Sequence, residues 1–322
     1  MIQTIDHLII AVRDIELAET NYTKLFGMPP VWHGAHKELG TINSIFNFEN
    51  TYLELLSANG QGPGSVFVNY VLEQNGEGLA GLAFGTKDMD QTLRALKTKA
   101  NGIYEPSIGE GQNFLDHTIR KWKTLFLPPK LSRGLFSFVI EHTEGELPPQ
   151  PLIDETAVNR LDHVVLKTSD ANGFITIFRD VLNIRLALDK TMDVSKGRML
   201  FFRLNKTTIE VIEQNNNESR DKLWGLAWAV KSIAATRDRL LNDGVDVTPI
   251  KRGLKENTLV ATVKSHTHKV PTLLIEHTAY DRLNIIVSFG RRTITLQAAY
   301  DHKSVRFADY TIGTNWSDDT IS

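Results

Sequence analysis

The first strand of the chain is predicted by the alternation of side chains over residues 5–12. Leu8, Ile10 and Val12 share one face of such a strand and are apolar. Successive side chains of a strand point to opposite faces, so this apolar face would pack beneath a helix. His7 then lies on the opposite face.

A helix and a hairpin follow this strand. Asp14 is placed to cap a helix whose apolar residues recur at helical spacing, and Gly27 closes that helix. Two apolar runs then flank the turn-like pair Glu49 and Asn50. This pattern predicts a hairpin whose last strand carries Glu54.

A second unit of one strand, a helix and further strands begins at Gly81 and ends with the strand LFSFVIEHT. In that strand the large apolar residues share one face and Glu141 lies on the other. We expect Glu141 to join His7 and Glu54 on the face opposite the helices, where the three would border a cavity. His142 would face the helix layer and be structural.

The second half of the chain repeats the first with constant spacing. IDHLIIAVRD returns as LDHVVLKTSD, and His163 follows His7 by 163 − 7 = 156 positions. Glu210 follows Glu54 by the same 210 − 54 = 156 positions, and VIEHT returns as LIEHT with Glu276. Such self-similarity indicates a duplicated architecture. Because several strands follow each helix, the pattern predicts an α+β fold of four βαβββ modules.

The four modules are expected to pair into two domains. The first would cover residues 1–145 and the second 159–282, joined by a proline-rich linker at 146–158. The tail at 283–322 alternates apolar and polar residues but matches no module, so it stays unassigned. A length of 322 residues suits two domains of ordinary size.

Composition narrows the classes of function. The chain has no cysteine, which excludes thiolate nucleophiles and disulfides and leaves histidines and carboxylates to bind any metal. The net charge of -2 offers no broad basic field for nucleic acid or an anionic membrane. The sequence has no phosphate-cradling glycine loop, nucleophile elbow or HExxH motif, so we expect no nucleotide cofactor.

The N-terminal residues contain neither a signal-peptide core nor a membrane span. We therefore expect a cytoplasmic protein, either a monomer or a homodimer. Its expected partner is a small-molecule ligand or substrate.

Short motifs mark the first and last strands of the modules. A DH pair occurs in the first strand of each half, and LEL, IEV or IEH occurs in the last strands. The stretch HKELGTINSIFNFENTYLELL is similar to a glyoxalase-like subfamily in which H..LGT.N precedes YLEL. Together the motifs resemble the vicinal oxygen chelate superfamily, which includes glyoxalase I, bleomycin-resistance proteins and extradiol dioxygenases. The resemblance covers residues 1 to about 280 and implies that each pair of modules forms a glyoxalase-like half-barrel.

In that superfamily, metal ligands come from the first and last strand of each module. The matching positions that can bind a metal are His7, Glu54 and Glu141 in the first domain, and His163, Glu210 and Glu276 in the second. Gly81 and Gly225 stand where many metal-binding members have a histidine.

One imidazole with two carboxylates resembles the facial triad that holds a divalent metal and leaves positions open for substrate oxygens. A divalent metal (Fe, Mn, Zn or Ni) is therefore the candidate cofactor. Glu54 and Glu141 are the candidate catalytic carboxylates that move a proton. The missing ligand favours instead a metal-free cavity, in which His7 and His163 belong to structural hydrogen-bond networks.

Three residues of the subfamily-like segment, His36, Thr41 and Asn43, are candidate substrate contacts. An asparagine on a cavity strand can fix a ligand carbonyl through both its donor and its acceptor. The alternative is that Asn43 is an ordinary turn residue.

Several tryptophans and arginines can be either functional or structural. Tryptophans can line a pocket or fill the core, and arginines can clamp an anion or face solvent. The residues concerned are Trp32, Trp122, Trp224, Trp228, Arg133, Arg198 and Arg203. His266 and His268 stand two apart, which suits a surface metal pair, a base near the second cavity or an exposed loop.

Two functions of different classes remain open. One is a metal-dependent lyase, isomerase or oxygenase acting on a small substrate with vicinal oxygens, although the missing histidine disfavours ring-cleaving dioxygenase chemistry. The other is a metal-independent protein that binds or sequesters a small molecule, as bleomycin-resistance proteins do. Fold alone does not select between them.

Overall fold

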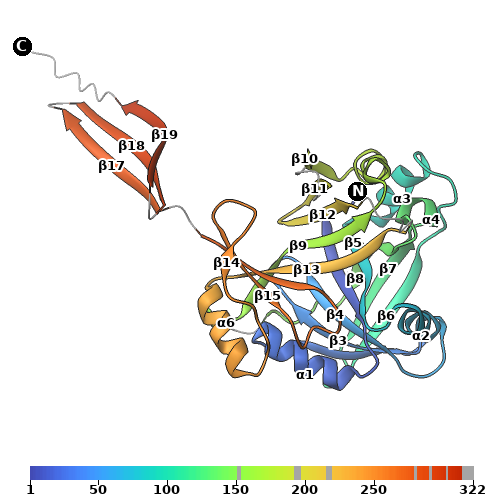
Figure 1. The fold of residues 1–322 in the computed structure, drawn as a ribbon. Coiled ribbons are helices and arrows are strands. Elements are labelled where there is room, and N and C mark those ends of the chain that lie inside the picture. Colours follow the sequence, from blue (N-terminus) through green and yellow to red (C-terminus); the bar gives the residue numbers. More distant parts are fainter. Residues whose placement is uncertain are drawn as a thin grey trace, which may run out of the picture. The chain divides into compact units, whose positions relative to one another are not determined.

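The structure is a computed structural model that describes residues 1–150, 154–191, 197–214 and 220–278, and the strands at 281–289, 292–301 and 304–313 (Figure 1). The chain forms two compact units. One comprises Met1–Lys251 and Val260–Glu276, and the other comprises Arg252–Leu259 and His277–Ser322.

The first two βαβββ modules follow one another from the N-terminus. The first consists of β1 (Thr4–Ala11), α1 (Ile15–Phe26), β2 (Trp32–His36), β3 (Thr41–Asn47) and β4 (Tyr52–Ala58). Helix α2 (Pro63–Asn75) leads to the second, which consists of β5 (Gly78–Gly85), α3 (Met89–Lys97), β6 (Ser107–Asn113), β7 (Ile119–Phe126), the short α4 (Pro129–Ser132) and β8 (Phe136–Glu144).

The third and fourth modules have the same order of elements. The third consists of β9 (Val158–Thr168), α5 (Ala171–Phe174) with its π-helical continuation η1 (Ile175–Val181), β10 (Arg185–Thr191), β11 (Arg198–Leu204) and β12 (Thr207–Glu213). The fourth consists of β13 (Lys222–Val230), α6 (Ile233–Asn242), β14 (Lys251–Arg252), β15 (Thr258–Val263) and β16 (Thr272–His277).

The same kind of side chain begins the helix of every module. Asp14, Asp88, Asp170 and Ser232 each accept a hydrogen bond from the backbone N–H three residues later. Such a bond satisfies one of the free donors at a helix N-terminus. The helix start predicted at Asp14 is therefore confirmed. Gly27 closes α1 in the left-handed conformation, with φ of 72°, which glycine adopts without strain.

The strands of the first two modules close into a barrel in the order β1-β4-β3-β2-β6-β7-β8-β5. Strand β2 meets β6 where Gly34 pairs with Asn113. A Cβ atom on Gly34 would lie 2.7 Å from the backbone oxygen of Gln112. A glycine at this position therefore allows the close backbone approach that closes the barrel.

The strands of the last two modules form a sheet in the order β10-β11-β12-β9-β13-β16-β15-β14. The central pairings match those of the barrel, since β9 runs parallel to β12 and antiparallel to β13. Within the described residues no pairing joins β10 to β14, so this sheet is open. The predicted α+β fold of four modules is confirmed, but the first pair of modules forms a full barrel rather than a half-barrel.

The predicted domain boundaries stay predictions, and residues 151–153 of the predicted linker lie outside the described residues. The unassigned tail contributes a three-stranded antiparallel sheet to the second unit. Its strands are β17 (Asp281–Phe289), β18 (Arg292–Asp301) and β19 (Ser304–Gly313).

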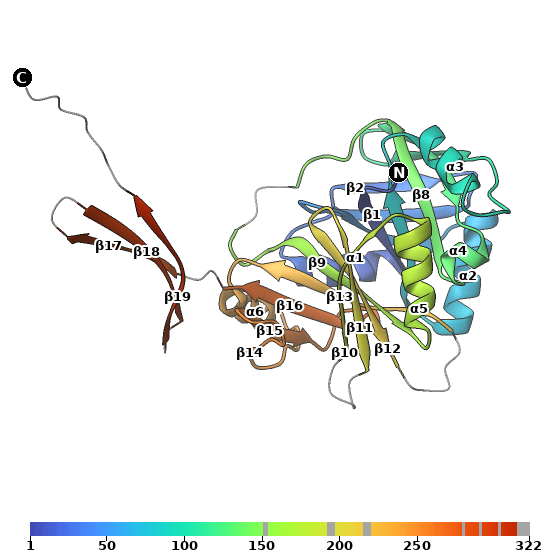
Figure 2. The ribbon, with the colours of Figure 1, turned by 90° about the horizontal axis from the view of Figure 1, so that it is seen from above.

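The barrel and the open sheet lie against each other, with β13 and α1 between them (Figures 1 and 2). Trp228 of β13 is fully buried at this contact. Its ring centroid lies 4.9 Å from that of Phe26 in α1 and 4.5 Å from that of Phe48. Arg239 of α6 donates to the backbone oxygens of Lys24 and Leu25, at the end of α1. Helix α1 therefore joins the two halves of the first unit. No helix within the described ranges is long and apolar enough to cross a membrane.

Trp228→Ala should destabilise the protein by about 3–5 kcal/mol, because it empties a fully buried site between the two sheets. Trp224→Ala is the matched control, since Trp224 is only half-buried and stacks on Lys167. Chemical denaturation monitored by circular dichroism measures both. An equal loss of unfolding free energy in the two variants would contradict this account of the packing.

Candidate active site

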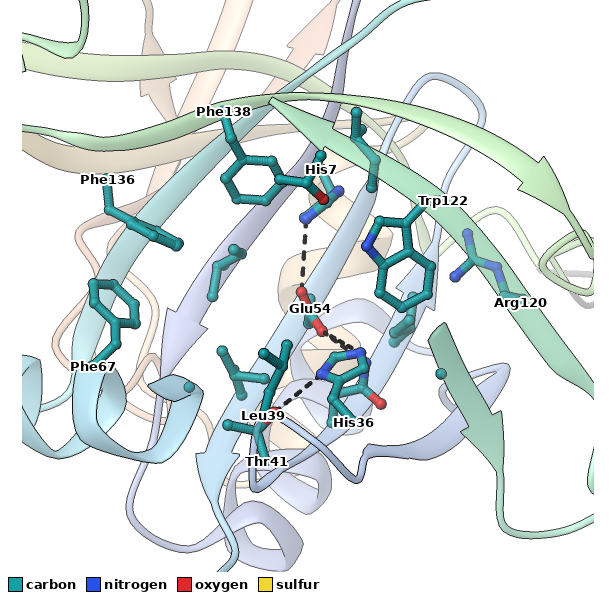
Figure 3. A pocket seen from close by; sticks show the side chains of 18 of the residues that line it. His7, His36, Leu39, Thr41, Glu54, Phe67, Arg120, Trp122, Phe136 and Phe138 are labelled. Carbon is teal, nitrogen blue, oxygen red and sulfur yellow. Dashed lines mark hydrogen bonds and ion pairs between the residues drawn. The ribbon is translucent and has the colours of Figure 1, made fainter. Parts of the chain in front are cut away.

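A cavity of about 310 Å³ lies inside the first barrel (Figure 3). Most of its wall is apolar, and the aromatic side chains in it are Trp32, Tyr52, Phe67, Trp122, Phe126, Phe136 and Phe138. The polar and charged side chains are His7, His36, Thr41, Asn43, Glu54, Arg120 and Thr124. A mainly apolar cavity with a few polar groups is typical of a small-molecule site.

Glu54 faces two imidazoles within this cavity. Strands β1 and β4 pair so that Glu54 lies opposite Ile9, on the same face as His7. Glu54 Oε2 is 3.6 Å from His7 Nε2, and Oε1 is 3.9 Å from His36 Nε2. Both distances are longer than a hydrogen bond. The carboxylate therefore faces both rings and is directly bonded to neither.

Asn43 holds this carboxylate in place. Its Nδ2 donates to Glu54 Oε1 at 2.6 Å and lies 3.4 Å from His36 Nε2. The other ring nitrogen of His36 lies 3.0 Å from Thr41 Oγ1. Asn43 Oδ1 is buried and has no partner among the described residues. One acceptor beside Glu54 is therefore free for a ligand.

Asp6 fixes the orientation of His7. Asp6 Oδ1 lies 2.7 Å from His7 Nδ1 and 3.1 Å from His142 Nε2. Burial raises the pKa of Asp6, but the hydrogen bonds and charges of His142 and His7 outweigh it and hold that pKa well below its ordinary value. The ionised carboxylate makes Nδ1 of His7 the donor, so Nε2 is the nitrogen that faces Glu54.

Burial sets the protonation of two other cavity groups. It lowers the pKa of His36, although Glu54 acts in the opposite direction, so this imidazole is neutral near pH 7. It raises the pKa of Tyr52 well above the ordinary value, so the phenol keeps its proton. Tyr52 stacks on His7 with ring centroids 4.5 Å apart. The cavity thus places two uncharged hydrogen-bonding groups beside Glu54.

The second half of the chain repeats the Asp-His-Glu arrangement. His163 Nδ1 lies 2.9 Å from Asp162 Oδ1, and its Nε2 lies 3.5 Å from Glu210 Oε2. Burial raises the pKa of Glu210, and Asp162 acts in the same direction while His163 opposes it. These residues lie on the open sheet, where the His163 side chain is 16% exposed, against 4% for His7.

Glu141 lies outside the cavity, so the placement predicted for it is wrong. The residues of β8 that face the cavity are Phe136, Phe138 and Ile140. Glu141 points the other way and lies 3.8 Å from Lys123 Nζ. The large aromatic residues of this strand fill the barrel, which leaves the intervening positions on the helix side.

Glu276 has the equivalent position in the second half, and its predicted placement beside His163 is also wrong. Its carboxylate accepts a hydrogen bond from the backbone N–H of Ile233, the first residue of α6. Glu276 therefore lies on the helix side of the sheet and binds the start of a helix.

The strand register shows which residue stands where the missing carboxylate was expected. Glu54 pairs with the residue two positions after His7. Ala83, two positions after Gly81, pairs with Phe138. In the second half Ala227, two positions after Gly225, pairs with Leu273. The fourth ligand position is therefore apolar in both halves.

The set of metal ligands that the resemblance implies is incomplete in both halves. Of the four positions that match the superfamily's ligands, each half has one imidazole and one carboxylate on the inner face, because glycine and an apolar residue hold the other two. A Cβ atom at Gly81 would lie 2.9 Å from Phe136 and 3.0 Å from Ile9. His36 also faces Glu54, but its Nε2 lies 3.4 Å from Asn43 Nδ2 and its Nδ1 lies 3.0 Å from Thr41 Oγ1. Across the described ranges, no three His, Cys, Asp or Glu side chains gather as a metal's ligands would.

The other predicted residues divide between the cavity and the rest of the fold. His36, Thr41, Asn43, Trp32 and Trp122 line the cavity. Trp228 fills the core, and Trp224 stacks on Lys167. Arg133 pairs with Asp221 and Asp170, Arg198 with Asp189, and Arg203 donates to Thr208.

The histidines outside the motif differ from expectation. His142 binds Asp6 and Arg120 instead of facing the helix layer. His268 forms no surface pair with His266, because its side chain is 6% exposed and lies 2.9 Å from Glu77. These residues belong to the turn between β15 and β16, not to a strand.

Sequence analysis missed three residues that shape the site: Asp6, Tyr52 and Arg120. Asp6 could have been found, since its repetition as Asp162 is as regular as that of His7. Tyr52 and Arg120 carry no such signal. Their importance comes from contacts across the barrel, which local patterns do not encode.

The paired βαβββ modules give the chain the fold of vicinal oxygen chelate proteins. In sequence, the Glyoxalase-like domain matches residues 5–182, and the chain belongs to this family. A comparison with curated proteins finds no significant match.

Solved structures resemble the chain over most of its length. A mutant form of 4-hydroxymandelate synthase from Streptomyces coelicolor gives a TM-score of 0.61 at 16% identity, covering 87% of this chain and 94% of that chain. The Mn(II)-bound glyoxalase from Novosphingobium aromaticivorans gives 0.59 at 14% identity, covering 86% and 83%. A hypothetical protein from Staphylococcus aureus gives 0.58 at 11% identity, covering 85% and 100%. At these identities the likeness shows the fold alone.

Asp6→Asn should change the acid dependence of stability. The folded state lowers the pKa of Asp6, so its ionised form stabilises the fold at neutral pH. That contribution is lost as the pH falls below about 4, the ordinary value of an aspartate, towards the folded-state pKa. Urea unfolding between pH 7 and pH 2 should show a steeper loss in the wild type than in Asp6→Asn. Identical pH profiles would contradict the role given to this carboxylate.

Proposed function

We propose that the protein is an enzyme of the isomerase or lyase type, which moves a proton on a small carbonyl compound bound in the first barrel. The observation that carries the proposal is the position of Glu54. This carboxylate is 6% exposed in an apolar cavity, faces His7 and His36, and is held by Asn43. A general base needs such a fixed position beside the substrate.

The cavity groups suit a substrate with a hydroxyl and a carbonyl on neighbouring carbon atoms. Asn43 Oδ1 would accept a hydrogen bond from the hydroxyl, and the protonated phenol of Tyr52 would donate one to the carbonyl oxygen. Glu54 would take the proton from the carbon that bears the hydroxyl, and the C–H electron pair would form an enediolate. Return of the carbon-bound proton to the former carbonyl carbon, together with transfer of the hydroxyl proton to the former carbonyl oxygen, gives the isomer with no change in overall oxidation state.

His7 would receive the proton while the enediolate exists. Its Nε2 faces Glu54 Oε2 at 3.6 Å, and its Nδ1 is bonded to ionised Asp6. A carboxylate in this position stabilises the imidazolium that forms. The proposed step uses side chains alone, because glycine and an apolar residue hold two of the four positions that match the superfamily's metal ligands.

Glu54→Gln should abolish proton exchange at the carbon beside the carbonyl. The probe is 2-hydroxyacetophenone in D₂O, and proton NMR follows the loss of its CH₂ signal. Removal of a general base lowers such a rate by about 100-fold or more. The matched control is Glu141→Gln, since Glu141 lies on a strand of the same barrel but outside the cavity.

Equal rates in Glu54→Gln and Glu141→Gln would show that Glu54 is not the base. No exchange in the wild type with any α-hydroxy ketone or aldehyde of this size, despite measurable binding, would favour a second function. That function is metal-independent binding or sequestration of an apolar molecule, and the aromatic wall of the cavity supports it.

The wild type should retain well below one equivalent of metal per chain. Purified protein is incubated with Fe, Mn, Zn or Ni, dialysed and analysed by mass spectrometry for its metal content. Proton exchange should also persist in a chelator, since the proposed step uses side chains alone. One equivalent of metal that His7→Ala removes would overturn this part of the proposal.

A further inference from the structure

Arg120 is a buried cation in the wall of the cavity (Figure 3). It lies on the face of β7 that also carries Trp122, Thr124 and Phe126 into the cavity. The residue is 6% exposed, so its charge is largely removed from water. A buried charge is costly unless it is paired and hydrogen-bonded.

No carboxylate lies within ion-pair distance of Arg120 in the part of the chain that the structure describes. Its Nη2 lies 3.3 Å from His142 Nδ1, and a further hydrogen bond joins it to Tyr52. Its Nε is buried without a partner among the described residues. Asp6 shares its oxygens between His142 and His7, so it reaches Arg120 only through His142.

The surroundings of the guanidinium are aromatic rather than acidic. Its central carbon lies 5.6 Å from the ring centroid of Trp32 and 5.5 Å from that of Tyr52. Cation–π contacts of this kind orient a guanidinium but leave its N–H donors free. The partly buried arginines elsewhere differ, since Arg133 and Arg239 each have an aspartate within ion-pair distance.

We propose that Arg120 is the anchor of a carboxylate group on the ligand, so that the cavity takes small monocarboxylates with an apolar, ring-sized body. This inference deepens the proposed function, because it names the substrate class of the same cavity. The planar fork of a guanidinium matches a carboxylate with two hydrogen bonds. The aromatic wall accepts the body, and Glu54 disfavours ligands of higher negative charge.

The test compares phenylacetate with phenylacetamide, which have nearly the same size and differ in charge. Isothermal titration calorimetry at pH 7.5 should show that the wild type binds the carboxylate about tenfold or more tightly than the amide. Arg120→Met should remove this preference while amide binding stays the same, which also shows that the cavity is intact. Arg120→Lys should keep part of it, since the charge remains but the fork is lost.

Equal affinity for the two probes in the wild type, or binding of neither, overturns the assignment of a carboxylate anchor. So does an undiminished preference in Arg120→Met. Glu54→Gln should keep or increase the preference for the carboxylate, because it removes the base and a negative charge but leaves the anchor. Loss of proton exchange and loss of carboxylate preference are thus separate results, and either proposal can fail alone.

Discussion

The parallel pairing of the first and last strands of a module is the constraint on which the site depends. It places Glu54 opposite Ile9, so that the glutamate and His7 share the inner face at a separation of 3.6 Å. The same pairing places Glu210 opposite Val165, beside His163 at 3.5 Å. Neither pair comes from neighbours in sequence, yet both arise whenever the module folds with this register. The closeness of this histidine and this glutamate is therefore set by strand pairing and not by a loop.

This regularity explains what the sequence could predict. The common spacing of 156 residues identified the duplication, and alternation along the first strand correctly placed His7 on the inner face. Alternation failed at Glu141, because a strand buried on both sides has two apolar faces and its pattern does not say which one is interior. In β8 the aromatic residues fill the barrel and the glutamate faces outward. Closure of the barrel could not be predicted from the sequence either, because it depends on a short pairing near Gly34 between β2 and β6, which are far apart in sequence.

Closure separates two otherwise similar sites. In the barrel, His7 and Glu54 are 3% and 6% exposed, and aromatic side chains surround them. On the open sheet the corresponding His163 is more exposed, so water competes for the same groups. Electrostatic interactions strengthen as water is excluded. The charges and hydrogen bonds of this arrangement therefore interact more strongly inside the barrel than on the open sheet. The duplication supplied two copies of one arrangement, and the first copy lines the cavity of the barrel.

The buried polar atoms without partners indicate which chemical groups a ligand of the cavity would carry. An unpaired buried donor or acceptor costs about 1–3 kcal/mol, so folds normally satisfy such groups internally. Asn43 Oδ1 and Arg120 Nε both lack a partner among the described residues, and both residues line the same cavity. Neither asparagine nor arginine would be needed there for packing, because apolar residues of similar volume would fill the same space without the cost. A ligand that complements this aromatic cavity would donate a hydrogen bond to Asn43 Oδ1 and place a negatively charged group against Arg120.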